Sequence, residues 1–182
     1  TSESTCQACN TNSDAPPGSS ALVHCICNVG WTGPNGGSCS SCVAGKYKPD
    51  TGDAACQNCG AGKFSQSTGK SSESTCSSCT ANSNAPEGSA SSSDCACNAG
   101  FTGPDGGPCV GCVAGKFKAE TGDAACIDCG AGKYSPSSRQ TSESTCLQCI
   151  LNSNSPAGSD AASDCQCNAG FEGTDCSRKS CP

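Results

Sequence analysis

Cysteine is the residue type whose number and spacing can do chemistry in this chain. It supplies 22 of the 182 residues, and many occur as Cys-x-x-Cys or Cys-x-Cys pairs. Thiols in such pairs can hold zinc, exchange with other disulfides, or close into structural disulfides. They recur with a period of 70 residues, so that Cys6, Cys76 and Cys146 line up. The chain therefore holds about two and a half copies of one eight-cysteine unit.

The other residues of the repeat do not support a metal or redox site. His24 is the only histidine, and it stands where the other copies carry Asp94 and Asp164, so no histidine ligand recurs. Redox catalysis by Cys-x-x-Cys needs a thiol of depressed pKa, usually at a helix N-terminus, and the sequence predicts no such helix. We therefore expect neither a metal nor a cofactor.

Composition makes structural disulfides the remaining explanation. Leu, Ile, Val and Phe together supply only 15 of 182 residues, too few to bury an ordinary core. Cysteine at this density marks a disulfide scaffold, which persists only in an oxidising compartment. The sequence therefore predicts an extracellular or luminal protein held together by disulfides.

The spacings suggest how the cysteines pair. Gaps of 12 to 17 residues alternate with gaps of one or two residues through most of the chain, so the short gaps are interpreted as linkers between closed loops. Each loop of this size is worth roughly 3 kcal/mol in the chain-entropy model. Sequential pairing leaves Cys6 and Cys181 over. Its pairs are Cys9–Cys25, Cys27–Cys39, Cys42–Cys56, Cys59–Cys76, Cys79–Cys95, Cys97–Cys109, Cys112–Cys126, Cys129–Cys146, Cys149–Cys165 and Cys167–Cys176.

A crossed arrangement, as in growth-factor-type modules, stays open at this point. It would join Cys59 to Cys79, Cys76 to Cys95 and Cys97 to Cys109, and it would leave Cys9 over instead of Cys6. Spacing alone does not decide between the two schemes.

The elements between the cysteines are expected to be short. Gly, Pro, Asn, Asp and Ser interrupt the chain every few residues, and no helical or long alternating pattern appears. We predict a small disulfide-rich fold, an extended rod of tandem short β-hairpin and loop units with almost no helix. The seven aromatic residues fall on three positions of the unit, where they should pack on neighbouring disulfides. The predicted domains are repeats 1–70 and 71–140 and a partial repeat 141–182.

The net charge and the hydropathy of the sequence exclude two classes of partner, nucleic acid and the membrane interior. The net charge is -6 with no basic patch, so nucleic acid is not an expected partner, and no apolar run is long enough for a membrane span. The chain begins and ends inside repeats, and we expect it to be a segment of something longer. Asp50 and Asp53, like Glu120 and Asp123, are interpreted as solvated turn residues near Lys48 and Lys118. Calcium is not predicted, and no catalytic site is expected.

Several motifs resemble those of a known family. The run Cys42-Val-Ala-Gly-Lys-Tyr, with Cys59-Gly-Ala-Gly-Lys-Phe and Cys76-Ser-Ser-Cys79, resembles the ephrin-receptor-like cysteine-rich repeat. That resemblance covers the whole chain and implies sequential closure of the loops in a rod-like ectodomain. The parts Cys95–Cys109 and Cys165–Cys176 look like the C-terminal half of an epidermal-growth-factor-like module, so repeat 3 ends in such a half. The array as a whole is similar to those in large surface proteins of algae and other protists, such as mastigoneme proteins.

The resemblance also bears on modification. Thr32 and Thr102 lie in Gly-aromatic-Thr-Gly, which resembles the site of a single O-linked sugar in growth-factor-like modules, while Glu172 stands at that place in the third copy. We hypothesise O-glycans on both threonines. There is no Asn-x-Ser/Thr sequon, and N-glycans are not expected. If the source is algal, Pro16, Pro17, Pro86 and Pro156 are candidates for hydroxylation.

The expected function is structural. We predict a spacer segment of a large extracellular protein, part of a surface filament or fibril, with self-association or neighbouring domains of the same chain as partners. The alternative is a ligand-binding segment of a receptor ectodomain, which an exposed apolar patch unique to one copy would favour. The candidates are Leu22, Val23 and Ile26 in copy one, and Leu147, Ile150 and Leu151 in copy three.

Overall fold

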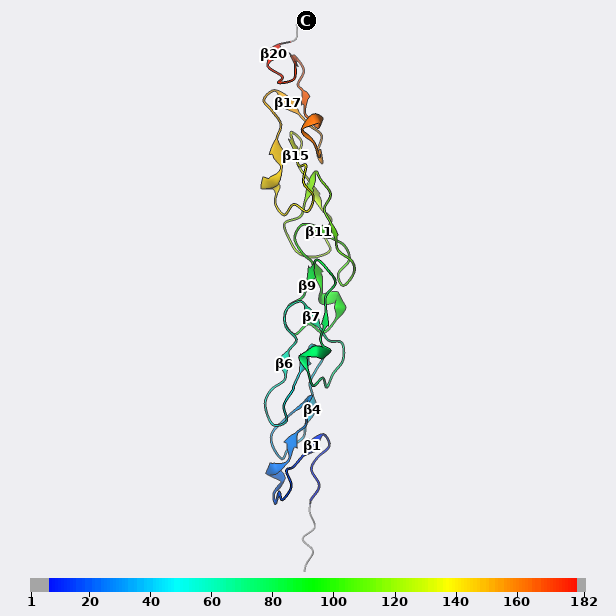
Figure 1. Ribbon diagram of the computed structural model, residues 1–182, viewed down its shortest axis with the longest axis vertical. Helices are drawn as coiled ribbons and strands as arrows, with labels where there is room; N and C mark the ends of the chain where they lie inside the picture. Colours follow the sequence, from blue (N-terminus) through cyan, green and yellow to red (C-terminus); the bar gives the residue numbers. More distant parts are fainter. Residues whose placement is uncertain (1–6, 180–182) are drawn as a thin grey trace, which may run out of the picture. The chain divides into compact units, whose positions relative to one another are not determined.

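The computed structural model describes residues 7–179 (Figure 1). These residues form two compact units, each considered on its own. Unit 1 runs up to Cys79 and includes Asn84–Cys95, and unit 2 comprises Thr80–Ser83 and the described residues from Ala96 onward. The predicted repeat boundaries at 70 and 140 stay a prediction.

Every strand in the described residues is two residues long, and each pairs with a single partner. Between them lie five three-residue 3-10 turns, η1 (Leu22–His24), η2 (Glu73–Thr75), η3 (Ser92–Asp94), η4 (Glu143–Thr145) and η5 (Ala162–Asp164). No α-helix occurs between residues 7 and 179. The prediction of small disulfide-rich hairpin units with almost no helix is confirmed.

The strand pairs are antiparallel hairpins that follow the chain. In unit 1 they are β1 (Ser13–Asp14) with β2 (Ile26–Cys27), β3 (Trp31–Thr32) with β4 (Ser40–Ser41), β5 (Lys46–Tyr47) with β6 (Gln57–Asn58), and β7 (Lys63–Phe64) with β8 (Ser77–Ser78). In unit 2 they are β11 (Phe101–Thr102) with β12 (Val110–Gly111), β13 (Lys116–Phe117) with β14 (Ile127–Asp128), β15 (Lys133–Tyr134) with β16 (Leu147–Gln148), β17 (Ser153–Asn154) with β18 (Gln166–Cys167), and β19 (Phe171–Glu172) with β20 (Arg178–Lys179). The two remaining strands are β9 (Ser83–Asn84) and β10 (Ala96–Cys97).

Most hairpins pair a loop with the linker that follows it. Tyr47 pairs with Gln57 and Lys46 with Asn58, and these two linker residues lie between Cys56 and Cys59. A two-residue pair of strands is not stable in water by itself. The Cys42–Cys56 bridge closes the same hairpin and holds its strands together.

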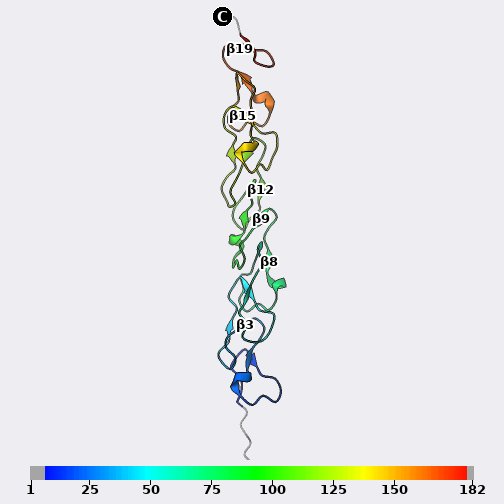
Figure 2. The ribbon, with the colours of Figure 1, turned by 90° about the vertical axis from the view of Figure 1, so that its left-hand side faces the viewer.

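Backbone hydrogen bonds then join one loop to the next within each unit. Gly45 donates to the Ser65 carbonyl (2.8 Å), Lys48 to the Lys70 carbonyl (2.9 Å), and Gly69 to the Cys42 carbonyl (2.8 Å). Unit 2 repeats the set, with donors at Gly115, Lys118 and Arg139. In both views of unit 1 the hairpins from β1 to β7 follow one another in chain order (Figures 1 and 2).

The interior of the described chain is built mainly from disulfides. The buried apolar residues between 7 and 179 are cysteines apart from Ala85 and Phe117. Phe117 forms a cluster with Cys129 and Cys146, the bridge of the next loop. An aromatic ring against a neighbouring disulfide is the packing that the sequence predicts. Bridge-by-bridge packing takes the place of one shared core.

Two repeated sequence motifs meet at one turn. The Ser72 side chain accepts a hydrogen bond from the Ser74 amide at the start of η2, and Glu73 pairs with Lys63 at 2.7 Å. In η4, Ser142, Glu143 and Lys133 repeat these contacts at 2.8 Å for the ion pair. The Ser-Glu-Ser-Thr-Cys motif is thus a capped turn whose glutamate binds the lysine of Gly-Lys-aromatic.

Replacing Gly45 with alanine should open this region. Gly45 has φ +79°, and a Cβ there would lie 2.1 Å from the Gly88 carbonyl oxygen, two loops further along. We expect Gly45→Ala to lower the opening free energy, read by amide exchange at Gly88, by about 2 kcal/mol or more. Gly170→Ala is the control, because Gly170 has φ +87° and nothing within 4 Å. If Gly170→Ala lowered the local opening free energy by the same amount, the close approach of Gly45 to Gly88 would make no contribution to stability.

Two positions that differ between the copies, Gly111 and Arg139, should be energetically coupled. In unit 2 a Cβ on Gly111 would lie 2.7 Å from Arg139 Cγ, and the Arg139 guanidinium lies 5.6 Å from the Phe101 ring centroid. Copy one has Ser41, Gly69 and Trp31 at these places. We expect Gly111→Ser to cost about 1 kcal/mol with Arg139 present and much less with Arg139→Gly.

The measurement is a double-mutant cycle on amide exchange at Lys118. Gly130→Ser serves as the control, because nothing lies within 4 Å of its added Cβ. Additive effects of Gly111→Ser and Arg139→Gly would show that the two positions are independent.

Candidate functional site

Ten disulfides close the loops of the described chain. They join Cys9–Cys25, Cys27–Cys39, Cys42–Cys56, Cys59–Cys76, Cys79–Cys95, Cys97–Cys109, Cys112–Cys126, Cys129–Cys146, Cys149–Cys165 and Cys167–Cys176. Their Cα–Cα distances run from 5.3 Å to 5.9 Å, within the range that a disulfide spans.

The structure pairs the cysteines in sequential order. The crossed scheme would share only Cys97–Cys109 with it, and Cys59 is bonded to Cys76 instead of Cys79. Cys6 and Cys181, which sequential pairing leaves over, lie outside the described residues.

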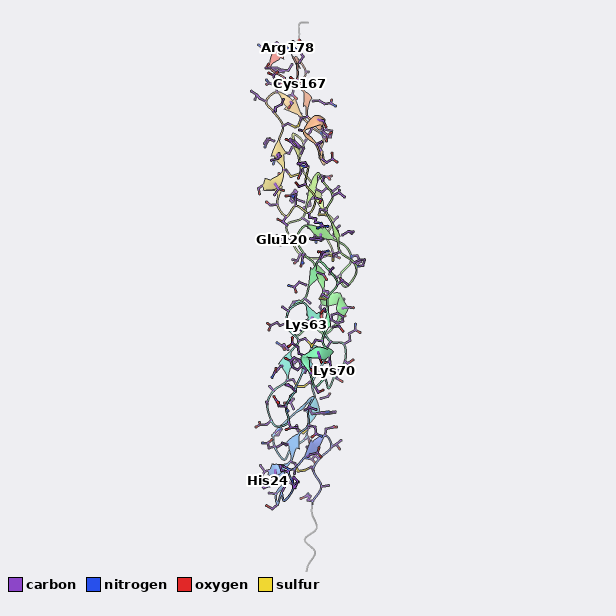
Figure 3. All side chains as sticks on the ribbon, viewed as in Figure 1. His24, Lys63, Lys70, Glu120, Cys167 and Arg178 are labelled. Atoms are coloured by element: carbon purple, nitrogen blue, oxygen red, sulfur yellow. A yellow bond between two sulfur atoms is a disulfide. The ribbon has the colours of Figure 1, made fainter. Side chains whose placement is uncertain are left out.

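The acidic residues that flank the buried lysines lie at the surface. Asp50, Asp53, Glu120 and Asp123 are all exposed. Figure 3 labels Glu120 among the side chains. Among residues 7–179 no group of three His, Cys, Asp or Glu side chains is placed to hold a metal ion. His24 is exposed on η1, at the place where Asp94 caps η3 in copy two.

Lys48 and Lys118 have a role that the sequence does not reveal. They are only 1% and 2% exposed, although lysine is rarely buried. Lys48 Nζ donates to the carbonyls of Trp31 (2.9 Å) and Gly52 (2.7 Å), and Lys118 Nζ donates to the carbonyls of Phe101 and Gly122. Each ammonium therefore ties its own loop to the preceding one.

Local hydrogen bonds lower the pKa values of two exposed carboxyl groups, those of Glu143 and Asp175. The hydrogen bond from Lys133, with its positive charge, lowers the pKa of Glu143. The hydroxyl and amide of Ser177 lower the pKa of Asp175. Both shifts favour the ionised form, which suits surface ion pairing and turn capping.

Thr32 and Thr102 already use their hydroxyls. Thr32 Oγ1 donates to the Ala54 carbonyl (2.9 Å), and Thr102 Oγ1 donates to the Ala124 carbonyl (2.9 Å). Both bonds reach into the next loop. An O-linked sugar would replace the hydroxyl hydrogen and with it the donor.

Apolar side chains specific to one copy are exposed. In copy three the exposed fractions are 48% for Leu147, 49% for Ile150 and 82% for Leu151, while Leu22 and Val23 in copy one are 39% and 59% exposed. Ile26 is half-buried. Copy two carries Thr80 where copy three has Ile150, and the Thr80 hydroxyl donates to the Gly107 carbonyl (2.8 Å). Loop 167–176 is shorter than loop 97–109.

Peptide mapping of the unreduced protein tests the pairing directly. Because Cys76 and Cys79 lie three residues apart, stepwise reduction and alkylation is needed to tell their bridges apart. We expect it to show Cys59 bonded to Cys76 and Cys129 bonded to Cys146. Cys59 bonded to Cys79 would restore the crossed scheme.

Thr32→Val should weaken the contact between loops 27–39 and 42–56. Valine keeps the shape but loses the bond to Ala54, so we expect local opening to become easier by about 1 kcal/mol. Amide exchange in residues 46–56 measures it. Thr32→Ser retains the donor, and Thr51→Val removes an exposed hydroxyl for which no hydrogen bond is found. Equal effects of Thr32→Val and Thr51→Val would rule the contact out as a stabilising one.

Comparison with known proteins agrees with this geometry. The search of curated proteins finds no match to the chain. None of the helices between residues 7 and 179 is long and apolar enough to cross a membrane. Residues 32–76 match the family model described as tyrosine-protein kinase ephrin type A/B receptor-like, a receptor-type repeat and not a catalytic domain. The many disulfides and this match point to an extracellular location. Residues 32–76 are therefore similar to the ephrin-receptor-like cysteine-rich repeats.

Proposed function

We propose that the chain is a structural spacer segment of a large extracellular protein, and that this protein is part of a surface filament or fibril. The observation that carries the proposal is that the same contacts recur from one copy to the next. Bridges, buried lysines, Glu–Lys pairs and loop-to-loop backbone bonds recur at equivalent positions in copies one and two or in copies two and three. These recurring features hold loops together.

Covalent closure suits a load-bearing role. The bonded cysteines are separated by 9 to 17 positions in the sequence. A pulling force passes through each disulfide instead of the loop, so the loop is shielded from extension. Opening one loop breaks contacts only with the adjacent loops and with the second loop along, so stability adds along the array. Closed loops also resist proteolysis, which acts on opened chain.

Neighbouring domains of the same chain and further copies are the proposed partners. The backbone bonds between loops use peptide groups and glycines, which any unit of this type can supply. A net charge of -6 keeps such chains apart except where units dock end to end.

Labelling the native assembly tests the proposal. An antibody raised against residues 147–151, a segment specific to copy three, is imaged on extracellular material by electron microscopy. Regular axial spacing of the label along filaments is the expected result. Labels found singly on cell surfaces, with no polymer, would refute the filament role.

The second candidate function is ligand binding by a receptor ectodomain. The exposed Leu147, Ile150 and Leu151 favour it, because a patch specific to one copy is not needed for a uniform spacer. A variant with Leu147→Ser, Ile150→Thr and Leu151→Ala carries the residues of copy two. Loss of binding to cells or matrix by this variant, with Val110→Ser as the exposed control, would support the receptor role.

An O-linked sugar on Thr32 and Thr102 is also part of the proposal. Intact-mass measurement of the native protein should show one added glycan on each threonine and none on the third loop, which carries Glu172. The sugar would cost the bonds to Ala54 and Ala124, so residues 46–56 should exchange faster in the glycosylated form. Unmodified threonine at both positions would reject the hypothesis.

A further inference from the structure

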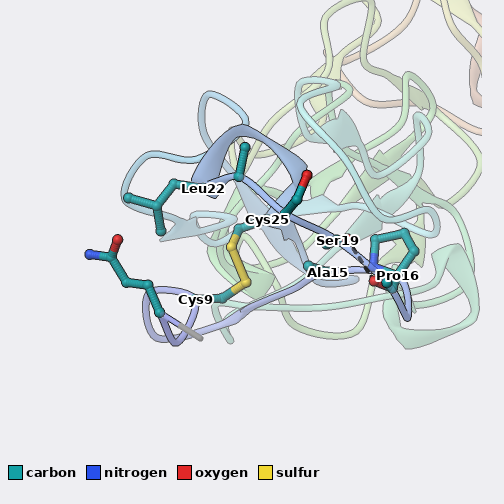
Figure 4. A pocket seen from close by; sticks show the side chains of 10 residues that line it. Cys9, Ala15, Pro16, Ser19, Leu22 and Cys25 are labelled. Atoms are coloured by element: carbon teal, nitrogen blue, oxygen red, sulfur yellow. Dashed lines mark hydrogen bonds between the residues drawn. A yellow bond between two sulfur atoms is a disulfide. The ribbon is translucent and has the colours of Figure 1, made fainter. Parts of the chain in front are cut away.

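Copy one has an open cavity of about 650 Å³ on one face of its first loop. Figure 4 shows it beside the Cys9–Cys25 bridge, with Ala15, Pro16, Ser19 and Leu22 around it. The corresponding faces of copies two and three are covered.

Burial at equivalent positions shows the difference. Ala15 is half-buried and Ser19 is exposed. Seventy residues on, Ala85 is 3% and Ser89 is 7% exposed, and in copy three the same positions are 2% and 8% exposed at Ser155 and Ser159. Something covers this face in the later copies.

The cover in copy two is the loop closed by Cys59–Cys76. Three backbone bonds hold it there: Gly62 donates to the Ala85 carbonyl (2.8 Å), Ser65 to the Ser89 carbonyl (3.1 Å), and Gly88 to the Cys59 carbonyl (2.9 Å). All of these residues lie in unit 1.

Copy three repeats the arrangement within unit 2. Gly132 donates to the Ser155 carbonyl (2.9 Å), Ser135 to the Ser159 carbonyl (3.1 Å), and Gly158 to the Cys129 carbonyl (2.9 Å). The same three bonds in two units define what fits the face: a loop of the form Cys-Gly-Ala-Gly-Lys-aromatic-Ser. Among the described residues, the Ala15 and Ser19 carbonyls have no such loop against them.

The sequence identifies where such a loop would join. Ser72–Cys76 and Ser142–Cys146 form the closing ends of the two covering loops, and residues 2–6 repeat the sequence Ser-Glu-Ser-Thr-Cys. Cys6 stands three residues before Cys9, as Cys76 stands before Cys79.

We propose that the face formed by Ala15, Gly18 and Ser19 is a docking surface for one further disulfide-closed loop of the 59–76 type, joined in cis through Cys6. This deepens the proposed function, because it makes the face a site from which the array continues. A second copy of the chain is a poorer occupant. In such a copy, the backbone donors of loops 59–76 and 129–146 are already hydrogen-bonded within their own chain.

The test supplies the missing loop. A second copy of residues 57–70, which contains one cysteine, is placed ahead of Thr1 in the full chain. The Gly18 amide should then exchange roughly tenfold more slowly and approach the rates of Gly88 and Gly158. Hydroxyl-radical footprinting should show protection of Pro16 and Leu22. In the matched control the added segment carries Pro at the place of Gly62, which removes the donor to Ala15, and Gly18 should stay fast.

Two results would overturn the inference. One is an unchanged Gly18 rate although the added cysteine is bonded to Cys6. The other is a Gly18 amide that already exchanges as slowly as the Gly88 amide in the original chain. If this slow exchange depended on protein concentration, a second copy of the chain would be the occupant. Neither result bears on the filament proposal, which depends on imaging of the native assembly.

Discussion

A pair of two-residue strands cannot hold itself together in water, so the covalent bridge across each loop is the interaction on which the other contacts depend. With Cys42 bonded to Cys56, the ends of the hairpin stay in register and Gly45 presents its amide to the next loop. Without the bridge the loop would be a polar, glycine-rich segment with no apolar surface to bury. Each loop then stabilises the loops beside it through peptide groups that closure has already positioned.

The backbone contacts explain why the repeat is so rich in glycine and so poor in apolar residues. Gly45 and Gly115 bring their Cα atoms against the carbonyls of Gly88 and Gly158, an approach that any side chain would prevent. Contacts therefore extend to the second loop along and are not confined to the adjacent one. The buried ammonium groups of Lys48 and Lys118 add a third link, made to carbonyls and, among residues 7–179, without a carboxylate partner.

Much of this could be predicted from the sequence, because cysteine spacing reports loop closure directly. The hairpin units, the scarcity of helix and the aromatic packing on disulfides follow from spacing and composition. The burial of Lys48 could not be predicted, since its partners are carbonyls of Trp31 and Gly52 and carbonyls leave no mark in a sequence. The bond from Thr32 to Ala54 was hidden for the same reason, and the motif suggested a sugar instead. The pairing of Glu73 with Lys63 could not be predicted either, because it requires the turn to be formed.

The central claim is that stability is local to each bridge and its neighbours. The most direct measurement is residue-resolved amide exchange on the chain with Cys112 and Cys126 both replaced by serine. The account predicts loss of protection at Gly100 and Arg139, whose amides bond to the opened loop, with Gly62 and Gly69 in unit 1 unchanged. Loss of protection at Gly62 and Gly69 as well would show one cooperative core and would contradict the account.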